Sequence, residues 1–308
     1  MRIEGLLKES GFLGSVRIME PMSKHTTLGI GGPAEAMAFP EDGDGLSRLR
    51  ALASANGVPV FILGGGSNLL VRDGGIEGLV INTSRMDGVI SERTDGEKFL
   101  VRAGAGAPLP KLANYCSEEG LSGLEFAAGI PGTVGGAVYM NAGAYGFEIK
   151  DVLHKIHVVA EDGTSLDLGS GELEKGYRHG GLPKNSAVAE AWFSLSPGDA
   201  EEIKKKAAGF MSKRRASQPL SSKSAGSTFK NPPGQKAWKL IEEAGLKGTA
   251  VGGAAVSEKH ANFLINAGGA TAKDFAALME LVVKTVQEKF NIKLEPEVKV
   301  VGTSLPFL

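Results

Sequence analysis

The alternation of apolar and polar positions predicts a mixed chain of strands and helices. Short apolar runs bounded by turn residues are typical of strands. Such runs lie at residues 58–63, 79–82, 99–103, 156–160 and 187–195. Apolar positions at helical spacing predict helices over residues 46–56 and 109–119.

A change of composition near residues 196–199 marks a predicted domain boundary. Residues 200–215 then have the pattern of a charged helix with a weak apolar face, and further helices are expected at 236–244 and 273–290. Thr271 and Asp274 offer a capping box for the last of these. Its buried stripe is predicted to consist of Phe275, Leu278, Met279, Val282, Val286 and Phe290.

A final strand is predicted over residues 292–301. Ile292, Leu294, Val298 and Val300 would face one side of it, with Lys293, Glu295, Glu297 and Lys299 on the other. The predicted fold class is therefore α+β. Residues 1–196 are predicted to form one α+β domain of the size that binds a nucleotide, with lobes of about 1–84 and 85–196. Residues 197–308 are predicted to form a smaller α+β domain.

Composition and charge exclude several classes of partner. With 34 Lys and Arg against 35 Asp and Glu, the formal charge of −1 gives no basic footprint for nucleic acid or for an anionic membrane surface. Glu4, Lys8 and Glu9 interrupt any signal peptide, and no apolar run approaches the roughly 20 residues of a membrane-spanning helix. The single cysteine, Cys116, forms no internal disulfide, and no Cys/His cluster has metal-ligand spacing. We expect a cytoplasmic protein with small-molecule ligands, no bound metal and no obligate protein partner.

Glycine is unusually abundant and clustered. The chain has 44 glycines, about twice the usual share of roughly 7%. The cluster Gly64 to Gly66 follows a strand-like run and precedes Ser67 and Asn68, without the spacing of a Rossmann loop or the Lys of a P-loop. Such a loop is commonly just a tight turn. Its N–H groups can also form a nest for a diphosphate.

A second cluster, residues 127–146, consists almost entirely of small side chains. A segment with so little bulk stays ordered only if something else fills the space, as a large planar cofactor lying against the backbone would. A tightly packed turn region between strands is the alternative. Together the two clusters favour a dinucleotide cofactor.

Recognisable motifs follow one another along nearly the whole chain. They are HTTLGIGG from His25, GGGSNLLV from Gly64, AGIPGTVGGAVYMNAGAYG from Ala128, GSTFKNP from Gly226, VSEKHANFLIN from Val256 and LEPEV from Leu294. In this order they resemble the motifs of the UDP-N-acetylenolpyruvoylglucosamine reductases, the MurB family. The resemblance implies a two-lobed FAD-binding domain of the type found in para-cresol methylhydroxylase (PCMH) and vanillyl-alcohol oxidase, followed by a substrate-binding domain.

Two details refine the resemblance. The inserted tyrosine-bearing loop of one subgroup is absent, so the chain is similar to the shorter second type. The family's Tyr-Arg-x-Ser reads Tyr177-Arg178-His179-Gly180 here, which removes the serine but keeps the arginine.

The resemblance implies noncovalent FAD, NADPH as hydride donor and a UDP-linked sugar as substrate. The implied reaction reduces UDP-N-acetyl-3-O-(1-carboxyvinyl)-glucosamine to UDP-N-acetylmuramate, a step of peptidoglycan precursor synthesis. Negative charge builds beside the substrate carboxylate, so the site needs a cation and a proton donor. By resemblance, Ser227 donates the proton, Arg178 faces the carboxylate and Glu297 helps to position or protonate the intermediate. Without the motifs, these three would be ordinary surface residues.

The remaining candidate residues bind ligands. Those implied for FAD are Gly64, Gly65, Gly66, Ser67, Asn68, Gly129, Pro131, Gly132, Thr133, Gly135, Gly136, Asn141 and Ala142. Candidates for the diphosphate, sugar or carboxylate of the substrate are Lys230, Asn231, Arg214, Gln218, Tyr145 and Lys299. His260 and Asn262 are expected as local caps at least as readily as ligand contacts.

Two other functions remain open at this point. A flavin-dependent oxidase of the same fold would use oxygen, and such oxidases often tether their flavin to a histidine in the glycine loop. Ser67 and Asn68 follow Gly66 instead, so this tether is absent from the loop. A non-enzymatic binder of flavin or sugar nucleotide would use the glycine clusters but would not need a serine, an arginine and a glutamate that handle developing charge.

Overall fold

The computed structural model describes residues 3–12, 14–93 and 98–304, and the chain divides into two compact units. Unit 1 comprises Met1–Ile18, Ala36–Gly65 and Gly78–Arg214, and unit 2 comprises Met19–Glu35, Gly66–Glu77 and Arg215–Leu308. The sequence-based boundary at residues 196–197 falls inside unit 1, because helix α5 (Ala200–Ser217) follows it and lies mostly in that unit.

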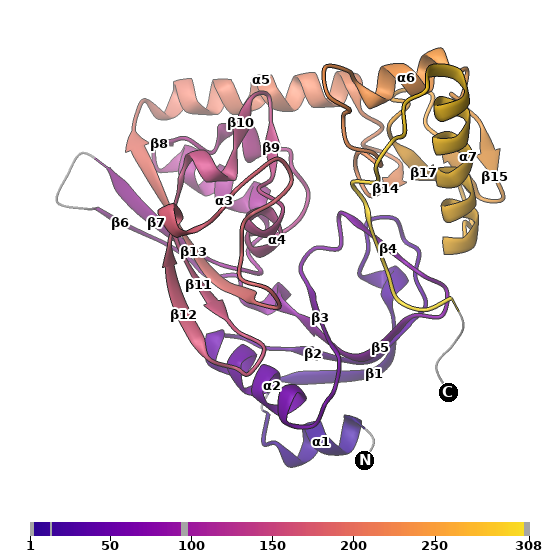
Figure 1. Ribbon diagram of the computed structural model, residues 1–308. Coiled ribbons are helices and arrows are strands. Elements are labelled where there is room, and N and C mark those ends of the chain that lie inside the picture. The colour runs from indigo at the N-terminus through magenta and orange to yellow at the C-terminus, as the bar shows by residue number, and fades with distance from the viewer. Residues whose placement is uncertain (1–2, 13, 94–97, 305–308) are drawn as a thin grey trace. The chain divides into compact units, whose positions relative to one another are not determined.

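The first sheet lies mainly in unit 1, with the strand order β1, β2, β5 and β3 (Figure 1). These strands are Ser15–Pro21, Pro33–Phe39, Ile76–Asn82 and Val60–Leu63. Helices α1 (Ile3–Glu9) and α2 (Gly43–Ala55) share its core, where Leu46 and Leu49 are buried with Ala38 and Ile81. Asp42 caps α2 by accepting the Gly45 N–H at 2.7 Å.

A larger antiparallel sheet forms the rest of unit 1. Its order is β12 (Ser165–Gly169), β11 (Leu153–Val159), β13 (Ala187–Pro197), β7 (Phe99–Gly104) and β6 (Val89–Arg93), and β8 (Leu121–Ser122) pairs with the end of β13. Alternate residues of β13 are buried, as expected for a strand with one face on a core.

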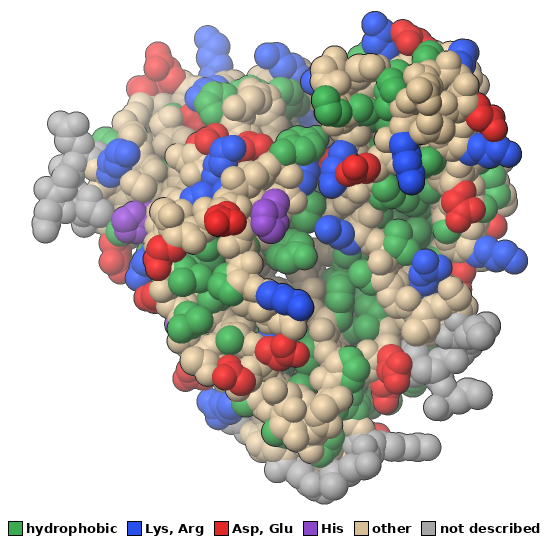
Figure 2. Space-filling view, in the orientation of Figure 1, with side chains coloured by type: hydrophobic (Ala, Val, Ile, Leu, Met, Phe, Trp, Pro, Cys, Tyr) green, Lys and Arg blue, Asp and Glu red, His purple; other side chains and the backbone are tan. Residues whose placement is uncertain are grey.

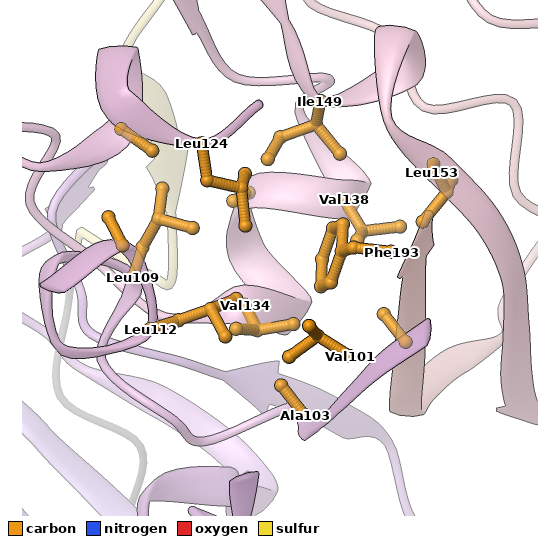
Figure 3. Close-up of a cluster of buried hydrophobic side chains, with 14 of the residues drawn as sticks. Val101, Ala103, Leu109, Leu112, Leu124, Val134, Val138, Ile149, Leu153 and Phe193 are labelled. Atoms are coloured by element: carbon orange, nitrogen blue, oxygen red, sulfur yellow. The ribbon is translucent and has the colours of Figure 1, made fainter. Parts of the chain in front are cut away.

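Helices α3 (Leu109–Glu118) and α4 (Val134–Tyr139) contribute to the core of this sheet. Figure 3 shows Val134 and Val138 of α4 among Val101 and Phe193 of the sheet. Cys116 on α3 is 1% exposed, and burial raises the pKa of its thiol to about 12. The hairpin β9 (Gly143–Ala144) and β10 (Phe147–Glu148) follows α4.

Unit 2 is built on a small antiparallel sheet in the order β14 (Lys223–Ser224), β17 (Leu264–Asn266), β16 (Ala254–Val256) and β15 (Ala250–Val251). Helices α6 (Ala237–Glu243) and α7 (Ala272–Phe290) share its core. In addition, β18 (Lys299–Val301) pairs in parallel with β4 (Leu69–Val71).

The amino terminus of α7 is capped twice. Thr271 and Asp274 form the predicted capping box, and Asp73 accepts the N–H groups of Ala272 and Lys273 at 2.8 and 3.0 Å. The predicted stripe of α7 is confirmed, with all its members fully buried except Phe290, which is half-buried.

The described chain also contains short 3₁₀ helices at Met22–Lys24, Thr83–Arg85, Glu125–Ala127, Ile149–Asp151 and Ser170–Glu172. Within this part of the chain, no helix is long and apolar enough to cross a membrane. On the face drawn in Figure 2, acidic and basic side chains are interspersed.

The prediction of a strand over residues 292–301 is wrong for most of that range. Only Lys299–Val301 is a strand, and Val300 is 39% exposed instead of sharing a buried face with Leu294 and Val298. Pro296 has no N–H to contribute to a ladder, so the preceding segment makes an isolated bridge between Pro296 and Phe229.

Candidate active site

The two glycine clusters meet within unit 1. A side-chain carbon at position 64 would lie 2.4 Å from Thr133 Oγ1, and one at position 65 would lie 2.9 Å from Gly132 Cα. Glycine at both positions therefore permits a backbone approach that any other residue would prevent. The structure brings these four candidate residues together.

Gly66 continues the same loop in unit 2. Its φ is +60°, and a side-chain carbon there would lie 2.0 Å from the carbonyl oxygen of His25. The Gly66 carbonyl accepts the Thr27 N–H at 3.2 Å. The motifs beginning at His25 and Gly64 are thus one packed feature, although they are far apart in the sequence.

The surroundings of Thr133 fit the expected dinucleotide. Thr133 is the N-cap residue of α4, yet its side chain caps no N–H group, and its buried Oγ1 has no hydrogen-bond partner. Buried hydroxyls are normally paired, so this oxygen marks a place for a polar ligand atom. Gly136 nearby is exposed, and a side-chain carbon there would lie 3.7 Å from Thr133 Oγ1. A hydroxyl that lacks a partner, next to backbone without side chains, suits a cofactor phosphate or sugar.

Other glycines of this segment are explained by packing within the protein. A side-chain carbon at Gly135 would lie 2.9 Å from Ala105 Cβ, and one at Gly129 would lie 2.9 Å from Arg214 Cδ. Packing within the protein therefore accounts for glycine at these two positions.

Arg178 lies in a tight turn of unit 1. Its φ is +56°, Gly176 and His179 exchange backbone hydrogen bonds around it, and its guanidinium lies 5.0 Å from the centre of the Tyr177 ring. The turn is fixed to α4 because the Gly180 N–H donates to the Tyr139 carbonyl at 2.9 Å.

This geometry accounts for the departure at position 180. A side-chain carbon there would lie 2.1 Å from the Val138 carbonyl oxygen. The serine of the resembled motif therefore does not fit this backbone.

Asn141 also holds the Arg178 turn. Its side-chain Nδ2 donates to the Gly176 carbonyl at 3.0 Å and to Glu148 at 3.1 Å, and its Oδ1 accepts the Lys150 N–H at 3.0 Å. The side chain predicted to contact the cofactor is thus bonded to the protein. Ala142 follows it and packs partly buried against the core of the large sheet.

Ser227 and Glu297 are neighbours in unit 2. The Thr228 carbonyl accepts the Glu297 N–H at 2.8 Å and the Val298 N–H at 3.3 Å. Both Ser227 and Glu297 are partly exposed. The structure therefore brings together two of the three predicted catalytic residues, and it places the third, Arg178, in unit 1.

Asn68, in the glycine loop, contacts the segment that carries Glu297. Its Nδ2 donates to the Glu297 carbonyl at 3.1 Å, and its own carbonyl accepts the Lys299 N–H at 3.0 Å. A residue predicted to contact FAD thereby also fixes the backbone of the predicted acid. Ser67 precedes it, partly exposed.

Several substrate candidates have partners within the protein. The Lys230 ammonium lies 3.3 Å from Glu295, in a pair that is largely exposed. Asn231 Oδ1 accepts the Ala237 N–H of α6 at 3.1 Å. Lys299 is exposed on β18.

Arg214 and Gln218 keep polar atoms without partners. Arg214 Nε and Gln218 Oε1 are buried and make no hydrogen bond, and burial lowers the pKa of the Arg214 guanidinium. Gln218 lines a cavity of unit 2 together with Arg215 and Lys259. Tyr145, in unit 1, donates its hydroxyl to the Phe210 carbonyl at 3.0 Å and stacks on that ring at 4.7 Å.

The sequence analysis did not decide whether Asn262 is a local cap or a ligand contact. Asn262 is 3% exposed and bonds the backbone on both sides of Phe229. His260 is adjacent, and its Nδ1 accepts the Asn262 N–H at 3.3 Å. The motif VSEKHANFLIN was the available signal, but the sequence does not say which backbone groups His260 and Asn262 meet.

Comparisons with known proteins indicate the same family over nearly the whole chain. A family model described as the C-terminal domain of UDP-N-acetylenolpyruvoylglucosamine reductase matches residues 218–301, and one described as an FAD binding domain matches residues 34–169. The UDP-N-acetylenolpyruvoylglucosamine reductase of Caldanaerobacter subterraneus subsp. tengcongensis is 48% identical over 98% of this chain and 97% of its own, and that of Geobacter metallireducens is 46% identical over 94% and 95%.

Solved structures give the same picture. The crystal structure of UDP-N-acetylenolpyruvylglucosamine reductase (MurB) from Thermus caldophilus matches with a TM-score of 0.78 at 39% identity, covering 93% of this chain and 98% of that one. An alkyldihydroxyacetonephosphate synthase matches with a TM-score of 0.50 at 17% identity over 63% of this chain and 40% of its own, which shows the fold alone.

Proposed function

Because the chain belongs to the UDP-N-acetylenolpyruvoylglucosamine reductase family and is an FAD-containing oxidoreductase, we propose that it catalyses the NADPH-dependent reduction of enolpyruvyl-UDP-N-acetylglucosamine to UDP-N-acetylmuramate. This reaction supplies a precursor of peptidoglycan. In this proposal residues 1–196 bind the FAD and residues 197–308 bind the substrate, and the two family matches fall within these ranges.

The residues proposed to hold the FAD are those of the two glycine clusters. Gly65 presents bare backbone beside Gly132, and Gly64 lies beside Thr133, whose buried hydroxyl lacks a partner. When bound, the FAD supplies the hydride that saturates the enolpyruvyl double bond.

The protein must handle the charge that develops on the substrate. As the terminal carbon gains a hydride, negative charge spreads over the neighbouring carbon and its carboxylate. Arg178 pairs with the carboxylate, because a guanidinium fork can donate to both of its oxygens. Ser227 donates its hydroxyl proton to the neighbouring carbon, which completes the reduction, and Glu297 helps to position this centre.

One observation carries the assignment of the proton donor. The Thr228 carbonyl accepts the Glu297 N–H at 2.8 Å directly beside Ser227, so the segments that carry this hydroxyl and this carboxylate are hydrogen-bonded to each other in the same compact unit. Surface serines and glutamates have no general reason to be fixed in this way.

Contacts to the rest of the substrate are proposed for Lys230, Asn231, Arg214, Gln218, Tyr145 and Lys299. Arg214 Nε and Gln218 Oε1 support this, because a buried polar atom without a partner costs about 1–3 kcal/mol and is relieved when a ligand pairs with it.

An anaerobic experiment with two half-reactions tests the function. NADPH should bleach the flavin of the wild-type holoenzyme, and addition of the enolpyruvyl sugar nucleotide should restore its colour with formation of the saturated product. Failure of the sugar nucleotide to reoxidise the flavin would reject the proposal.

Ser227→Ala should separate the half-reactions. We expect flavin reduction by NADPH to persist and reoxidation by the sugar nucleotide to slow by about 10²–10⁴-fold, the usual contribution of a positioned acid. Ser221→Ala lies in the same serine-rich segment, residues 217–227; it is the matched control and should behave as wild type. Equal slowing of both half-reactions in Ser227→Ala would remove Ser227 from the role of proton donor.

A further inference from the structure

Asn262 pairs with the chain next to Ser227 through both ends of its amide. Its Oδ1 accepts the Phe229 N–H at 3.0 Å, and its Nδ2 donates to the Phe229 carbonyl at 2.8 Å. Its own backbone carbonyl accepts the Thr228 N–H at 2.8 Å. Three hydrogen bonds from one residue, which is 3% exposed, therefore hold the two positions that follow Ser227.

Thr228, held in this way, fixes the backbone of Glu297, the predicted acid. The Thr228 carbonyl accepts the N–H groups of Glu297 and Val298, and Thr228 Oγ1 accepts the Leu264 N–H at 3.3 Å. Nearly every polar group of Thr228 and Phe229 thus has a named partner, while Ser227 itself remains partly exposed. The hydroxyl is presented by backbone that cannot easily move.

We infer that Asn262 is a positioning residue for proton delivery: its amide holds the backbone that follows Ser227 and, through Thr228, the backbone of Glu297. The inference rests on the proposed function, in which Ser227 is the donor. The uncharged amide supplies a donor to the Phe229 carbonyl and an acceptor to the Phe229 N–H. A donor displaced by about 1 Å loses on the order of 10²-fold in rate, so such a lock has kinetic consequences.

Two substitutions test the inference in the holoenzyme. Asn262→Ala removes both side-chain bonds, and Asn262→Asp keeps an acceptor for the Phe229 N–H but places a carboxylate against the Phe229 carbonyl. For both we expect reoxidation by the enolpyruvyl sugar nucleotide to slow by about tenfold or more, with flavin reduction by NADPH within about twofold of wild type. Equal slowing of both half-reactions, or no slowing, would overturn the inference.

The aspartate variant adds a readout that a purely structural role would not produce. Burial beside a carbonyl raises the pKa of the introduced carboxyl group. Below that pKa its O–H can donate to Phe229, so the ratio of reoxidation rate to reduction rate should recover as the pH falls. A ratio that does not recover contradicts the inference. The wild-type pH profile is the reference, because the other titratable groups nearby are the same in the wild type and in Asn262→Asp. These groups are His260, whose pKa is lowered by burial, Glu297 and the pair Lys230–Glu295.

Coupling to Ser227 is the second readout. If Asn262 acts through Ser227, the double variant Ser227→Ala with Asn262→Asp should reoxidise no more slowly than Ser227→Ala alone, because the effects of residues that act as a unit are not additive. Multiplicative effects would contradict the inference.

Asn266→Ala is the matched structural control. Asn266 Nδ2 donates to the Leu28 carbonyl at 3.0 Å, and its Oδ1 accepts the N–H groups of Gly268 and Ala270. Its loss should lower thermal stability and leave the ratio of the half-reactions unchanged. Should Asn262→Ala fail to retain flavin, Asn262→Asp in its acidic range decides the matter. If the sugar nucleotide does not reoxidise the wild-type enzyme at all, the proposed function is rejected. If the wild type is reoxidised and the Asn262 variants keep its ratio of half-reaction rates, only the role of Asn262 is rejected.

Discussion

At the scale of single residues, asparagines recur beside the predicted catalytic residues. Asn141 bonds the turn that carries Arg178, Asn68 bonds the Glu297 carbonyl, and Asn262 bonds the residue after Thr228. An asparagine side chain offers both a donor and an acceptor without a charge, so it can satisfy irregular backbone where no strand partner exists. Motif resemblance identified Ser227, Arg178 and Glu297, but sequence spacing alone gives no account of these supports.

The close contact at Gly180 leads to a prediction. Gly180→Ser should destabilise the protein by about 1–3 kcal/mol, because the added side chain would meet the Val138 carbonyl oxygen at 2.1 Å and force a shift. The shift should also slow the sugar-nucleotide half-reaction, since Arg178 lies in the same turn. Thermal unfolding and anaerobic reoxidation measure the two effects.

Gly176→Ser is the control for this change. It lies in the same turn, and an added side-chain carbon there would meet nothing within 4 Å. Its effect should stay within about 0.5 kcal/mol. Equal melting temperatures for the two variants would show that the contact at position 180 carries no cost.

At the scale of elements, helices with a clear apolar periodicity were predicted well, and elements without it were not. Helices α2, α3, α5 and α7 lie within one to three residues of the predicted limits at each end. Helix α4 was missed because its sequence, VGGAVY, contains two glycines and is read as loop. It forms because Val134 and Val138 are buried in the core, so tertiary packing outweighs low helix propensity.

The strand predicted over residues 292–301 is the converse case, because its sequence has the pattern of a strand but most of it does not form one. Its alternation was real, but Pro296 removes an N–H from the ladder, and Val300 is exposed beside β4. Val300 is exposed although it pairs with Leu70 of β4, so alternation alone does not say whether a face of a strand is covered.

Asp73 provides a prediction about α7. Asp73→Ala should cost about 1–2 kcal/mol of stability, because two N–H groups at the helix start lose a charged acceptor. Asp44→Ala is the control, since Asp44 lies in the first turn of α2 where Asp42 supplies the cap. Chemical denaturation of both variants makes the comparison, and equal midpoints would argue against the cap.

At the scale of the whole molecule, the two units are interleaved along the chain. Unit 2 takes Met19–Glu35 and Gly66–Glu77 from the first third of the sequence, and its core includes Leu28, Ile30 and Leu70. A linear reading of composition places one boundary near residue 196. It does not reveal that early segments complete a later core, because that is a matter of long-range packing.

This interleaving predicts the behaviour of a fragment. Residues 197–308 alone should not unfold cooperatively, because they lack the partner strand of β18 and three buried side chains worth about 1.5–3 kcal/mol each. Circular dichroism and amide exchange on the fragment test this, with the full chain as reference. A sharp melting transition in the fragment would contradict it.

The sealed thiol on α3 has a practical consequence. Burial raises the pKa of Cys116 to about 12, so little thiolate forms near neutral pH, and the sulfur is shielded from solvent as well. The protein is thus in effect free of reactive sulfur without any engineering. A cysteine placed on either unit would be the sole target of a maleimide dye, so a single fluorophore could report locally on ligand binding.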